Sequence, residues 1–441
     1  MKILLITSSA RGHAIADALS RSPQHPEIIA LCTSRNPGIK KLAIEQHVLD
    51  IMDFNKVLEI AKKSQPDFAI IGPEDPMGAG LADVLDQAGV HTVAPRKSLA
   101  RIESSKGFTR ELLQKYGIDA SPKFKVFGSP EDSSMSTFID HVLGGDFVIK
   151  YDALKGGKGV KVSGEHLDST EEGVAYAKEC IEECGKVVIE ERLVGQEFSL
   201  LSFVTGTNCI DMPVVQDHKR AYEGDTGPNT GGMGTYSDSN HSLPFLTKED
   251  LERASEVNRL TAQALLKECG VPFIGILYGG FIAVKDGIRL IEYNARFGDP
   301  EALNILPLLS SDFVDICQGM LSGELTDSMV TFDHKATVCM YITPKGYPVN
   351  KDQRGEPVGF PEVPPNARIF YGDISEEEDG TLKLGGSRTA GFVGIGNTIS
   401  EAQQVAQKLC EQVEGPVRFR SDIGTPDIVQ RRIDMLNELR A

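Results

Sequence analysis

The sequence predicts an α/β and α+β multidomain protein, with a parallel-sheet domain at the N-terminus, a central domain of longer strands and a small mixed α/β domain at the C-terminus. Three observations support this prediction. Over the first hundred residues, short apolar runs alternate with amphipathic stretches, and beyond them longer strands are joined by glycine-rich connections. The length of 441 residues corresponds to roughly three average domains.

The N-terminal domain is expected over residues 1–102. Its expected strands are the apolar runs at 3–6, 28–31, 68–71 and 91–93. Helical segments between them give a βαβα order, which predicts a parallel sheet with ligand sites at the carboxyl ends of its strands. Two such ends carry polar loops, at 7–13 and 72–76. The first loop has a single glycine and therefore lacks the G-x-G-x-x-G pattern of dinucleotide-binding folds.

The central domain is expected over residues 103–324, and the C-terminal domain over 325–441. The expected central strands are 147–150, 160–162, 187–191, 198–204, 276–284 and 290–294. Asp286-Gly287 marks a hairpin between the last two of these strands. In the C-terminal part, six prolines between Pro344 and Pro365 indicate extended or turn-rich structure.

Composition argues against several classes of protein. The chain has 63 acidic and 46 basic residues, and a net charge of -17 disfavours broad binding to nucleic acid or to an anionic membrane. The first apolar stretch ends at Thr7, which is too short for a signal peptide or a membrane span. The eight cysteines form no C-x-x-C pair, which fits reduced thiols and no zinc site. We therefore expect a cytoplasmic protein.

A loop rich in glycine and lysine follows the expected strand at 147–150. It has three glycines and two lysines between Lys155 and Gly159. Glycines let backbone N–H groups approach an anion closely and lysines add positive charge, so the loop has the chemistry of a phosphate-covering flap. Taken alone, the pattern fits a hairpin tip with solubilising lysines equally well.

Glu292 and Asn294 lie two residues apart in an expected strand and therefore share one face of it. One carboxylate and one amide oxygen suit Mg²⁺, which completes its coordination with water and nucleotide phosphates. Arg296 follows at once, and its guanidinium group could hold a carboxylate or phosphate beside the metal. This sequence favours a metal site over the alternative, an outward-facing polar surface.

Residues 216–234 contain five glycines and show no apolar periodicity. Loops of this length inside a domain are usually functional or disordered, and the many turn-forming residues favour a cradle for a small polar substrate. Two weaker signals accompany it. In the linker at 190–197, backbone groups could bind an adenine and Glu197 could bind ribose hydroxyls, and Lys106 stands near the start of an expected helix.

Taken in chain order, these motifs resemble the phosphoribosylamine–glycine ligase family of the ATP-grasp superfamily. The loop at 216–236 and the I-E-Y-N-A-R-F-G-D-P-E segment at 291–301 are the most specific to it, and the K-G-Y-P and V-E-G-P stretches at 345–348 and 413–416 resemble archaeal members. The resemblance implies a pre-ATP-grasp domain at the N-terminus and a central ATP-grasp domain with a mobile lid over 122–192.

The resemblance also implies an activity in de novo purine biosynthesis. ATP phosphorylates the carboxylate of glycine, and the amine of 5-phosphoribosylamine then attacks the glycyl phosphate. The implied cofactors are ATP as co-substrate and Mg²⁺ or Mn²⁺, and the implied assembly is a monomer or small homo-oligomer. Phosphoryl transfer needs positioning and charge neutralisation rather than a protein nucleophile, and the motifs supply both.

By the same resemblance, family roles fall on particular residues of this chain. ATP is expected at Lys106, Lys150, Gly156, Gly157, Lys158, Gly159, Glu190, Leu193 and Glu197, and the metal at Glu292 and Asn294. The expected catalytic residues are Asp217, Lys219, Arg296 and Asp299. Substrate binding is expected at Arg11, His13, Pro73, Glu74, Asn229, Thr230 and Gly298. Of these, Arg11, His13 and Glu74 are expected on the phosphoribosylamine side.

Two departures from the family pattern leave alternatives open. The family's first loop, G-x-G-G-R-E-H-A, is here S-S-A-R-G-H-A at 8–14, and Ala153 replaces the glycine of K-x-D-G-L. The first departure falls on the expected phosphoribosylamine site, so a paralogue that joins another amine to a small carboxylate is one alternative. A non-catalytic nucleotide sensor is another, although a sensor has no need of the metal pair.

Overall fold

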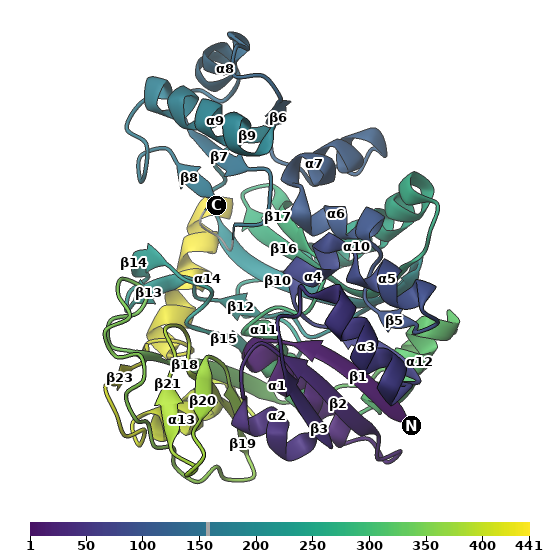
Figure 1. The fold of residues 1–441 in the computed structure, drawn as a ribbon. Coiled ribbons are helices and arrows are strands. Elements are labelled where there is room, and N and C mark those ends of the chain that lie inside the picture. Colours follow the sequence, from purple (N-terminus) through teal and green to yellow (C-terminus); the bar gives the residue numbers. More distant parts are fainter. Residues whose placement is uncertain (156–158) are drawn as a thin grey trace.

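The computed structural model describes residues 1–155 and 159–441. Three members of the expected flap, Gly156, Gly157 and Lys158, lie outside the described residues. The predicted fold class is confirmed: a parallel-sheet domain, a central domain with a projecting subdomain and a smaller C-terminal domain follow one another along the chain (Figure 1).

The N-terminal domain is a five-stranded parallel sheet in the order β3-β2-β1-β4-β5. Its strands are β1 (Lys2–Thr7), β2 (Glu27–Cys32), β3 (Glu45–Val48), β4 (Phe68–Ile71) and β5 (Thr92–Val93), and its helices are α1 (Ser9–Ser20), α2 (Pro37–Leu42), α3 (Phe54–Ser64), α4 (Glu74–Ala79) and α5 (Leu81–Gln87). Because β1 pairs directly with β4, the two predicted polar ends lie side by side. Most of their residues form the first turns of α1 and α4, so the expectation of loops was wrong there.

Helices α6 (Lys97–Ser104) and α7 (Lys106–Lys115) lead into a small antiparallel sheet in the order β6-β9-β7-β8. Its strands are β6 (Phe124–Phe127), β7 (Phe147–Tyr151), β8 (Val160–Val162) and β9 (Val187–Glu191), and α8 (Ser134–Thr137) and α9 (Thr170–Cys184) accompany them. This subdomain has its own hydrophobic cluster and stands above the rest of the molecule in Figure 1. Lys150 and Glu190 lie on its neighbouring strands β7 and β9.

The central sheet has the order β11-β10-β16-β17. Its strands are β10 (Gln196–Gly206), β11 (Asn208–Asp211), β16 (Phe273–Val284) and β17 (Gly287–Asn294), and α10 (Lys248–Cys269) packs against it. The predicted hairpin at Asp286-Gly287 is confirmed, because Val284 pairs with Gly287. Helix α10 begins with a capping box between Thr247 and Asp250, which satisfies two backbone groups at its start.

The C-terminal domain is built on a sheet in the order β12-β15-β18-β22-β19, with β23 paired to β18. Strands from two separate parts of the chain form this sheet. Its strands from this part of the chain are β18 (Ala336–Pro344), β19 (Ala367–Tyr371), β22 (Ala390–Gly396) and β23 (Val417–Arg418), beside the hairpin β20 (Ile374–Glu376) and β21 (Leu382–Leu384) and the helix α13 (Ile399–Cys410). The strands β12 (Gln216–Asp217) and β15 (Gly234–Ser237) come from the predicted substrate loop. That loop is therefore part of the C-terminal sheet.

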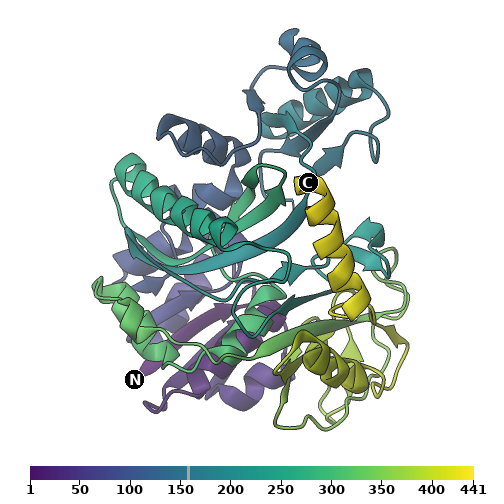
Figure 2. The same cartoon turned by 180° about the vertical axis from the view of Figure 1, so that it is seen from behind.

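Two further connections matter for the site. Helices α11 (Glu301–Ile305) and α12 (Phe313–Ser322) follow β17, and the last helix, α14 (Pro426–Arg440), runs from the C-terminal domain back to the central sheet (Figure 2). Among residues 1–155 and 159–441, no helix combines the length and the apolar character needed to cross a membrane.

Candidate active site

The predicted residues of the N-terminal domain meet the segment after β17. The Arg11 Nη1 group donates to the Phe297 carbonyl at 2.8 Å, and Arg11 Nη2 lies 3.1 Å from Glu74 Oε2. The same Glu74 oxygen lies 3.3 Å from Arg296 Nε. Pro73 directly precedes α4 and so places Glu74 in the first turn of that helix. The carboxyl ends of β1 and β4 therefore share one polar site with the end of β17.

Charge is closely balanced at this junction. Burial opposes ionisation of Glu74, but the guanidinium groups of Arg296 and Arg11 outweigh it and lower the pKa of Glu74 to about 2. A second carboxylate, Glu103 of α6, lies 3.0 Å from Arg296 Nη2 and accepts a hydrogen bond from the Ala295 backbone N–H at 2.8 Å. Burial raises the pKa of Glu103. Arg296 is thus held between two carboxylates from different helices.

The proposed metal pair lies at the end of β17. Glu292 and Asn294 occupy alternate positions opposite Gly280 and Tyr278 of β16, as the strand period predicts. Arg296 Nη2 donates to Asn294 Oδ1 at 3.2 Å, and Lys106 Nζ lies 3.9 Å from Glu292 Oε2.

Electrostatics favour an ionised Glu292. Burial opposes ionisation of its carboxyl group, but Lys106, Lys219 and Lys150 outweigh that effect and keep its pKa below the ordinary range. In the described part of the chain, no group of three or more His, Cys, Asp or Glu side chains gathers around a common point. A lone carboxylate with one amide oxygen fits Mg²⁺, which retains water and phosphate ligands, better than a metal that needs a full protein cage.

The residues expected at the nucleotide include a buried ionic triad. The Glu190 carboxylate pairs with Lys150 Nζ and also accepts from Arg110 Nε at 2.9 Å. Lys150 Nζ donates to the Ile291 carbonyl at 3.0 Å, which joins the small upper sheet to β17. Burial lowers the pKa of Lys150 despite the neighbouring carboxylate. Arg110 belongs to α7 and was not among the predicted residues.

The remaining residues expected at the nucleotide lie on α7, on β10 and just before β8 and β10. Lys219 Nζ donates to Glu197 Oε2 at 2.8 Å, and the Glu197 carboxylate raises the pKa of Lys219. Leu193 is partly exposed in the connection between β9 and β10. Lys106 is the first residue of α7, and the backbone carbonyl of Gly159 accepts from the Tyr151 N–H at 2.8 Å.

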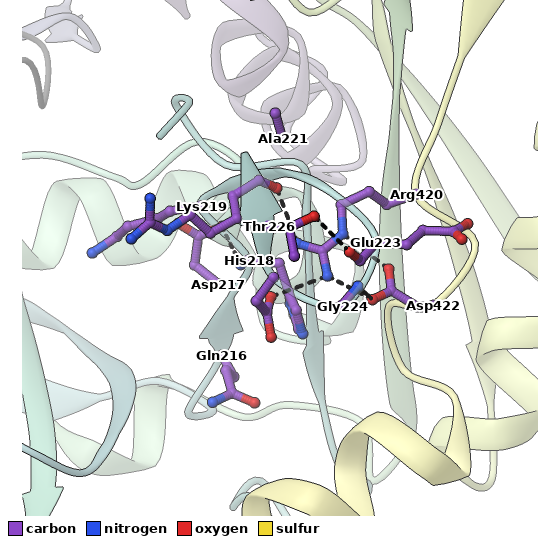
Figure 3. Close-up of polar contacts among 12 residues, drawn as sticks. Gln216, Asp217, His218, Lys219, Ala221, Glu223, Gly224, Thr226, Arg420 and Asp422 are labelled. Carbon is purple, nitrogen blue, oxygen red and sulfur yellow. Dashed lines mark hydrogen bonds and ion pairs between the residues drawn. The ribbon is translucent and has the colours of Figure 1, made fainter. Parts of the chain in front are cut away.

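The long segment at 216–234 is more regular than its sequence predicted. It holds β12, the two-stranded hairpin β13 (Arg220–Tyr222) and β14 (Thr226–Asn229), and the start of β15, so the expectation of an irregular loop was wrong. Thr230 donates to the Lys219 carbonyl from both its N–H, at 2.7 Å, and its hydroxyl, at 2.8 Å. Asn229 ends β14 and pairs with Arg220. Figure 3 shows this segment against Arg420 and Asp422 of the C-terminal domain.

Asp217 and Asp299 face different electrostatic surroundings. Burial and the nearby Glu301 carboxylate raise the pKa of Asp217 well above the ordinary range. Burial also opposes ionisation of Asp299, but Arg388 and Arg11 keep its pKa low. Asp299 Oδ2 accepts from the Arg11 N–H at 3.3 Å. At the neighbouring Gly298, an added Cβ would lie 2.1 Å from Glu301 Oε2, so a side chain there would displace Glu301.

Arg388 is a site residue that the sequence did not indicate. From the C-terminal domain, its Nη1 group donates to the carbonyls of Gly231 at 2.6 Å, Gly232 at 3.0 Å and Asp299 at 2.8 Å. The glycine pair Gly385-Gly386 shortly before it suggests a turn but does not point to a functional arginine.

His13 of α1 contacts the C-terminal domain. Its Nδ1 atom accepts from the Tyr371 N–H at 3.0 Å, and its ring stacks on the Tyr371 ring at a centroid distance of 5.7 Å. Burial lowers the pKa of His13 to about 3, so the imidazole is neutral. The structure therefore places His13 between the N-terminal and C-terminal domains, where it packs against β19.

Comparison with known proteins gives one consistent result. Three models of phosphoribosylglycinamide synthetase match in order: the N domain at residues 1–103, the ATP-grasp (A) domain at 104–302 and the C domain at 337–426. A phosphoribosylamine–glycine ligase of Methanococcus maripaludis is 45% identical over 100% of both chains. The expected similarity to archaeal members is thereby confirmed.

Solved structures agree with this comparison. The crystal structure of phosphoribosylamine–glycine ligase from Thermotoga maritima aligns with a TM-score of 0.79 at 28% identity, covering 96% of this chain and 100% of that one. A biotin carboxylase domain from Hydrogenobacter thermophilus, solved with MgADP, shares the fold at a TM-score of 0.71 and 14% identity, covering 99% of this chain and 93% of that one.

Proposed function

The chain belongs to the phosphoribosylglycinamide synthetase family, and from this premise we propose that it joins glycine to 5-phosphoribosylamine with ATP. The products are glycinamide ribonucleotide, ADP and phosphate, and the reaction is a step of de novo purine biosynthesis. The protein is thus an ATP-dependent carbon–nitrogen ligase. One observation carries the assignment within the structure: Arg296 contacts both Asn294 of the metal pair, at 3.2 Å, and Glu74 of the N-terminal domain, at 3.3 Å.

We assign the nucleotide to the region where the small sheet β6-β9-β7-β8 meets the end of β17. Its proposed contacts are Lys106, Lys150, Gly159, Glu190, Leu193 and Glu197, together with Gly156, Gly157 and Lys158 outside the described residues. Glu292 and Asn294 would hold Mg²⁺, which neutralises charge on the phosphate oxygens. Mn²⁺ is proposed as a substitute because carboxylate and carbonyl oxygens suit it as well.

The chain's own residues support a two-step reaction. In the first step an oxygen of the glycine carboxylate forms a bond to the γ-phosphorus as ADP leaves. In the second the amine of phosphoribosylamine attacks the acyl carbon and phosphate leaves. Lys219 and Arg296 supply positive charge where the acyl phosphate forms. We assign to Asp217 the acceptance of the proton that the amine loses, because burial and Glu301 raise the pKa of its carboxyl group.

We assign Arg11, Glu74, Asn229 and Thr230 to the binding of phosphoribosylamine, and Asp299 to the orientation of the two substrates. Pro73, Gly298 and His13 shape this side of the site by packing. The full-length match to the Methanococcus ligase favours this reaction over the paralogue and the nucleotide sensor, because it covers 100% of both chains. We further propose a cytoplasmic monomer or small homo-oligomer and domains at 1–102, 103–324 and 325–441, with a lid at 122–192.

The test is an assay of ADP and phosphate release. Wild-type protein should release both only when Mg²⁺, ATP, glycine and phosphoribosylamine are all present. The Glu292→Gln variant should lose about 100-fold in kcat, because the charge that holds the metal is removed. Equal ADP release without glycine would reject the proposed function. Mg²⁺-dependent turnover at the wild-type rate in Glu292→Gln would reject the metal assignment.

A further inference from the structure

The hairpin β13–β14 projects from the substrate segment and is docked on the C-terminal domain (Figure 3). Asp225, at its tip, has a φ of 58°, in the left-handed region that non-glycine residues rarely adopt. Its carboxylate pairs with two arginines, Arg420 Nη2 at 3.0 Å and Arg432 Nη2. A disfavoured backbone conformation persists where its surroundings enforce it, and such positions cluster at functional sites.

Arg420 is fully buried and uses all of its nitrogens. Its Nη1 donates to the Arg220 carbonyl at 3.0 Å, and its Nε and Nη2 hold Asp422 at 2.9 and 2.7 Å. Asp422 in turn accepts from the Gly224 N–H at 2.9 Å. We call Asp225, Arg420, Asp422 and Arg432 the hairpin clamp, because together they fix both the backbone and the tip of the hairpin.

The clamp is balanced in charge. It contains two carboxylates and two guanidinium groups. His218 lies buried beside it, and within residues 1–155 and 159–441 neither of its ring nitrogens has a hydrogen-bond partner. Burial and the nearby Arg420 lower the pKa of His218 to about 3, so the ring adds no charge. Arg420 is fully buried, while the side chains of Asp225, Asp422 and Arg432 are 26%, 17% and 21% exposed. A buried guanidinium group is costly to leave unpaired, so the four hydrogen bonds of Arg420 hold the hairpin in one position.

The base of the hairpin carries the residues assigned to catalysis. Lys219 directly precedes β13, and its carbonyl accepts both hydrogen bonds from Thr230 at the other end of the hairpin. The Arg220 carbonyl held by Arg420 is only one residue away from Lys219. A displacement of the hairpin at the clamp is therefore transmitted to Lys219 through one short, hydrogen-bonded ribbon.

The last helix contributes one residue to the clamp, and its far end is attached separately to the central domain. Arg432 lies on α14, beyond the residues 337–426 matched by the C-domain model. At the far end of the same helix, Arg440 forms two hydrogen bonds of 2.8 Å with buried Asp250 of α10. Helix α14 thus runs from the hairpin to the central domain, as the yellow helix in Figure 2 shows.

From this arrangement we propose that Arg420 and Asp225 are positioning residues, through which the C-terminal domain and α14 hold Lys219 in its working place. The inference rests on the proposed ligase function of the site. Lysine cannot replace Arg420 here, because a single ammonium nitrogen cannot reach Asp225, Asp422 and the Arg220 carbonyl with the fork geometry of a guanidinium group.

The experiment compares Arg420→Lys and Asp225→Asn with a matched control, Arg440→Lys, which weakens the other end of α14 without touching the hairpin. Wild-type turnover with glycine and phosphoribosylamine is measured first, so failure of the proposed function shows as an inactive wild type. In Arg420→Lys and Asp225→Asn, kcat should fall about 10- to 100-fold, as displacements of about 1 Å can cause. The Kd for ADP should change less than about threefold, because the predicted nucleotide contacts lie outside the clamp.

Hydrogen exchange supplies a readout independent of activity. The amides of residues 219–230 should exchange faster in both clamp variants and at the wild-type rate in Arg440→Lys. With an active wild type, unchanged kcat or unchanged exchange in Arg420→Lys would overturn the proposal. Loss of activity in all three variants in proportion to the unfolded fraction would overturn it as well, because the clamp would then act only on stability.

Discussion

The buried triad of Arg110, Lys150 and Glu190 makes the stability of the central domain depend on one carboxylate. In Glu190→Gln, two cations would face a neutral amide in the protein interior. The side chains of Arg110 and Glu190 are only 2% and 4% exposed, so water cannot compensate for the lost charge. Removal of one partner of a buried ion pair typically costs about 3–5 kcal/mol.

The lower end of this range applies here. Arg110 keeps its hydrogen bonds to the carbonyls of Leu290 and Ile291, at 2.9 and 2.8 Å, and Lys150 can lose its proton because burial already lowers its pKa. We therefore expect Glu190→Gln to lose about 3 kcal/mol. For a unit of roughly 200 residues this corresponds to a fall in Tm of about 6–12 °C.

The assay is urea and thermal unfolding followed by circular dichroism or tyrosine fluorescence, since the chain has no tryptophan. The matched control is Glu165→Gln, which removes a carboxylate that pairs with Arg220 but is 35% exposed, and which should cost less than about 1 kcal/mol. Burial opposes ionisation of Glu190, but Arg110 and Lys150 lower its pKa below the ordinary 4.5. Its contribution is therefore present above pH 4.5 and is lost as the pH falls through the lowered value. Equal stability of the two variants, or a stability difference that does not shrink in acid, would refute this reasoning.

Three further outcomes are expected. Glu103→Gln should lower kcat/KM for glycine about tenfold with the Kd for ADP unchanged, because Arg296 loses one of its two carboxylates; unchanged kinetics would contradict that role. Glu74→Gln should remove the share of the acid loss of stability between about pH 4.5 and 2 that the lowered pKa of Glu74 predicts, so acid unfolding of the variant should be less steep than that of the wild type. Because burial lowers the pKa of His13 from 6.5 to about 3, wild-type stability should fall as the pH drops below 6.5, and His13→Gln should reduce that slope in thermal unfolding while His218 maintains the remainder.

The features that the sequence could predict are those with local or periodic signals. The alternation of apolar runs predicted the parallel sheet with ligand sites at the carboxyl ends of its strands, and the structure adds that two polar ends lie side by side because β1 and β4 are neighbours. The period of a strand placed Glu292 and Asn294 on one face. These predictions need only the geometry of one element or the rule that parallel strands end at one edge.

Features fixed by distant contacts could not be predicted in the same way. Glu103 accepts from the Ala295 N–H across 192 positions of the chain, and Arg110 reaches the Leu290 carbonyl across 180. The hairpin β13–β14 has no apolar alternation because its backbone is held by Arg418 and Arg420 rather than by burial of one face. Its strands therefore carry no pattern that a periodicity argument can detect.

Even in a chain with a net charge of -17, cations of the proposed site are individually paired. Four of the described cations that we assign to ATP or substrate each have a carboxylate partner: Lys106 with Glu292, Lys150 with Glu190, Lys219 with Glu197 and Arg296 with Glu74. Phosphates therefore exchange places with carboxylates rather than meeting free positive charge. An exchange of this kind needs added positive charge to be favourable, and a divalent cation held by Glu292 would supply it while releasing Lys106 toward the nucleotide. We therefore expect nucleotide binding at these paired cations to depend on the metal, which unpaired lysines at the same positions would not require.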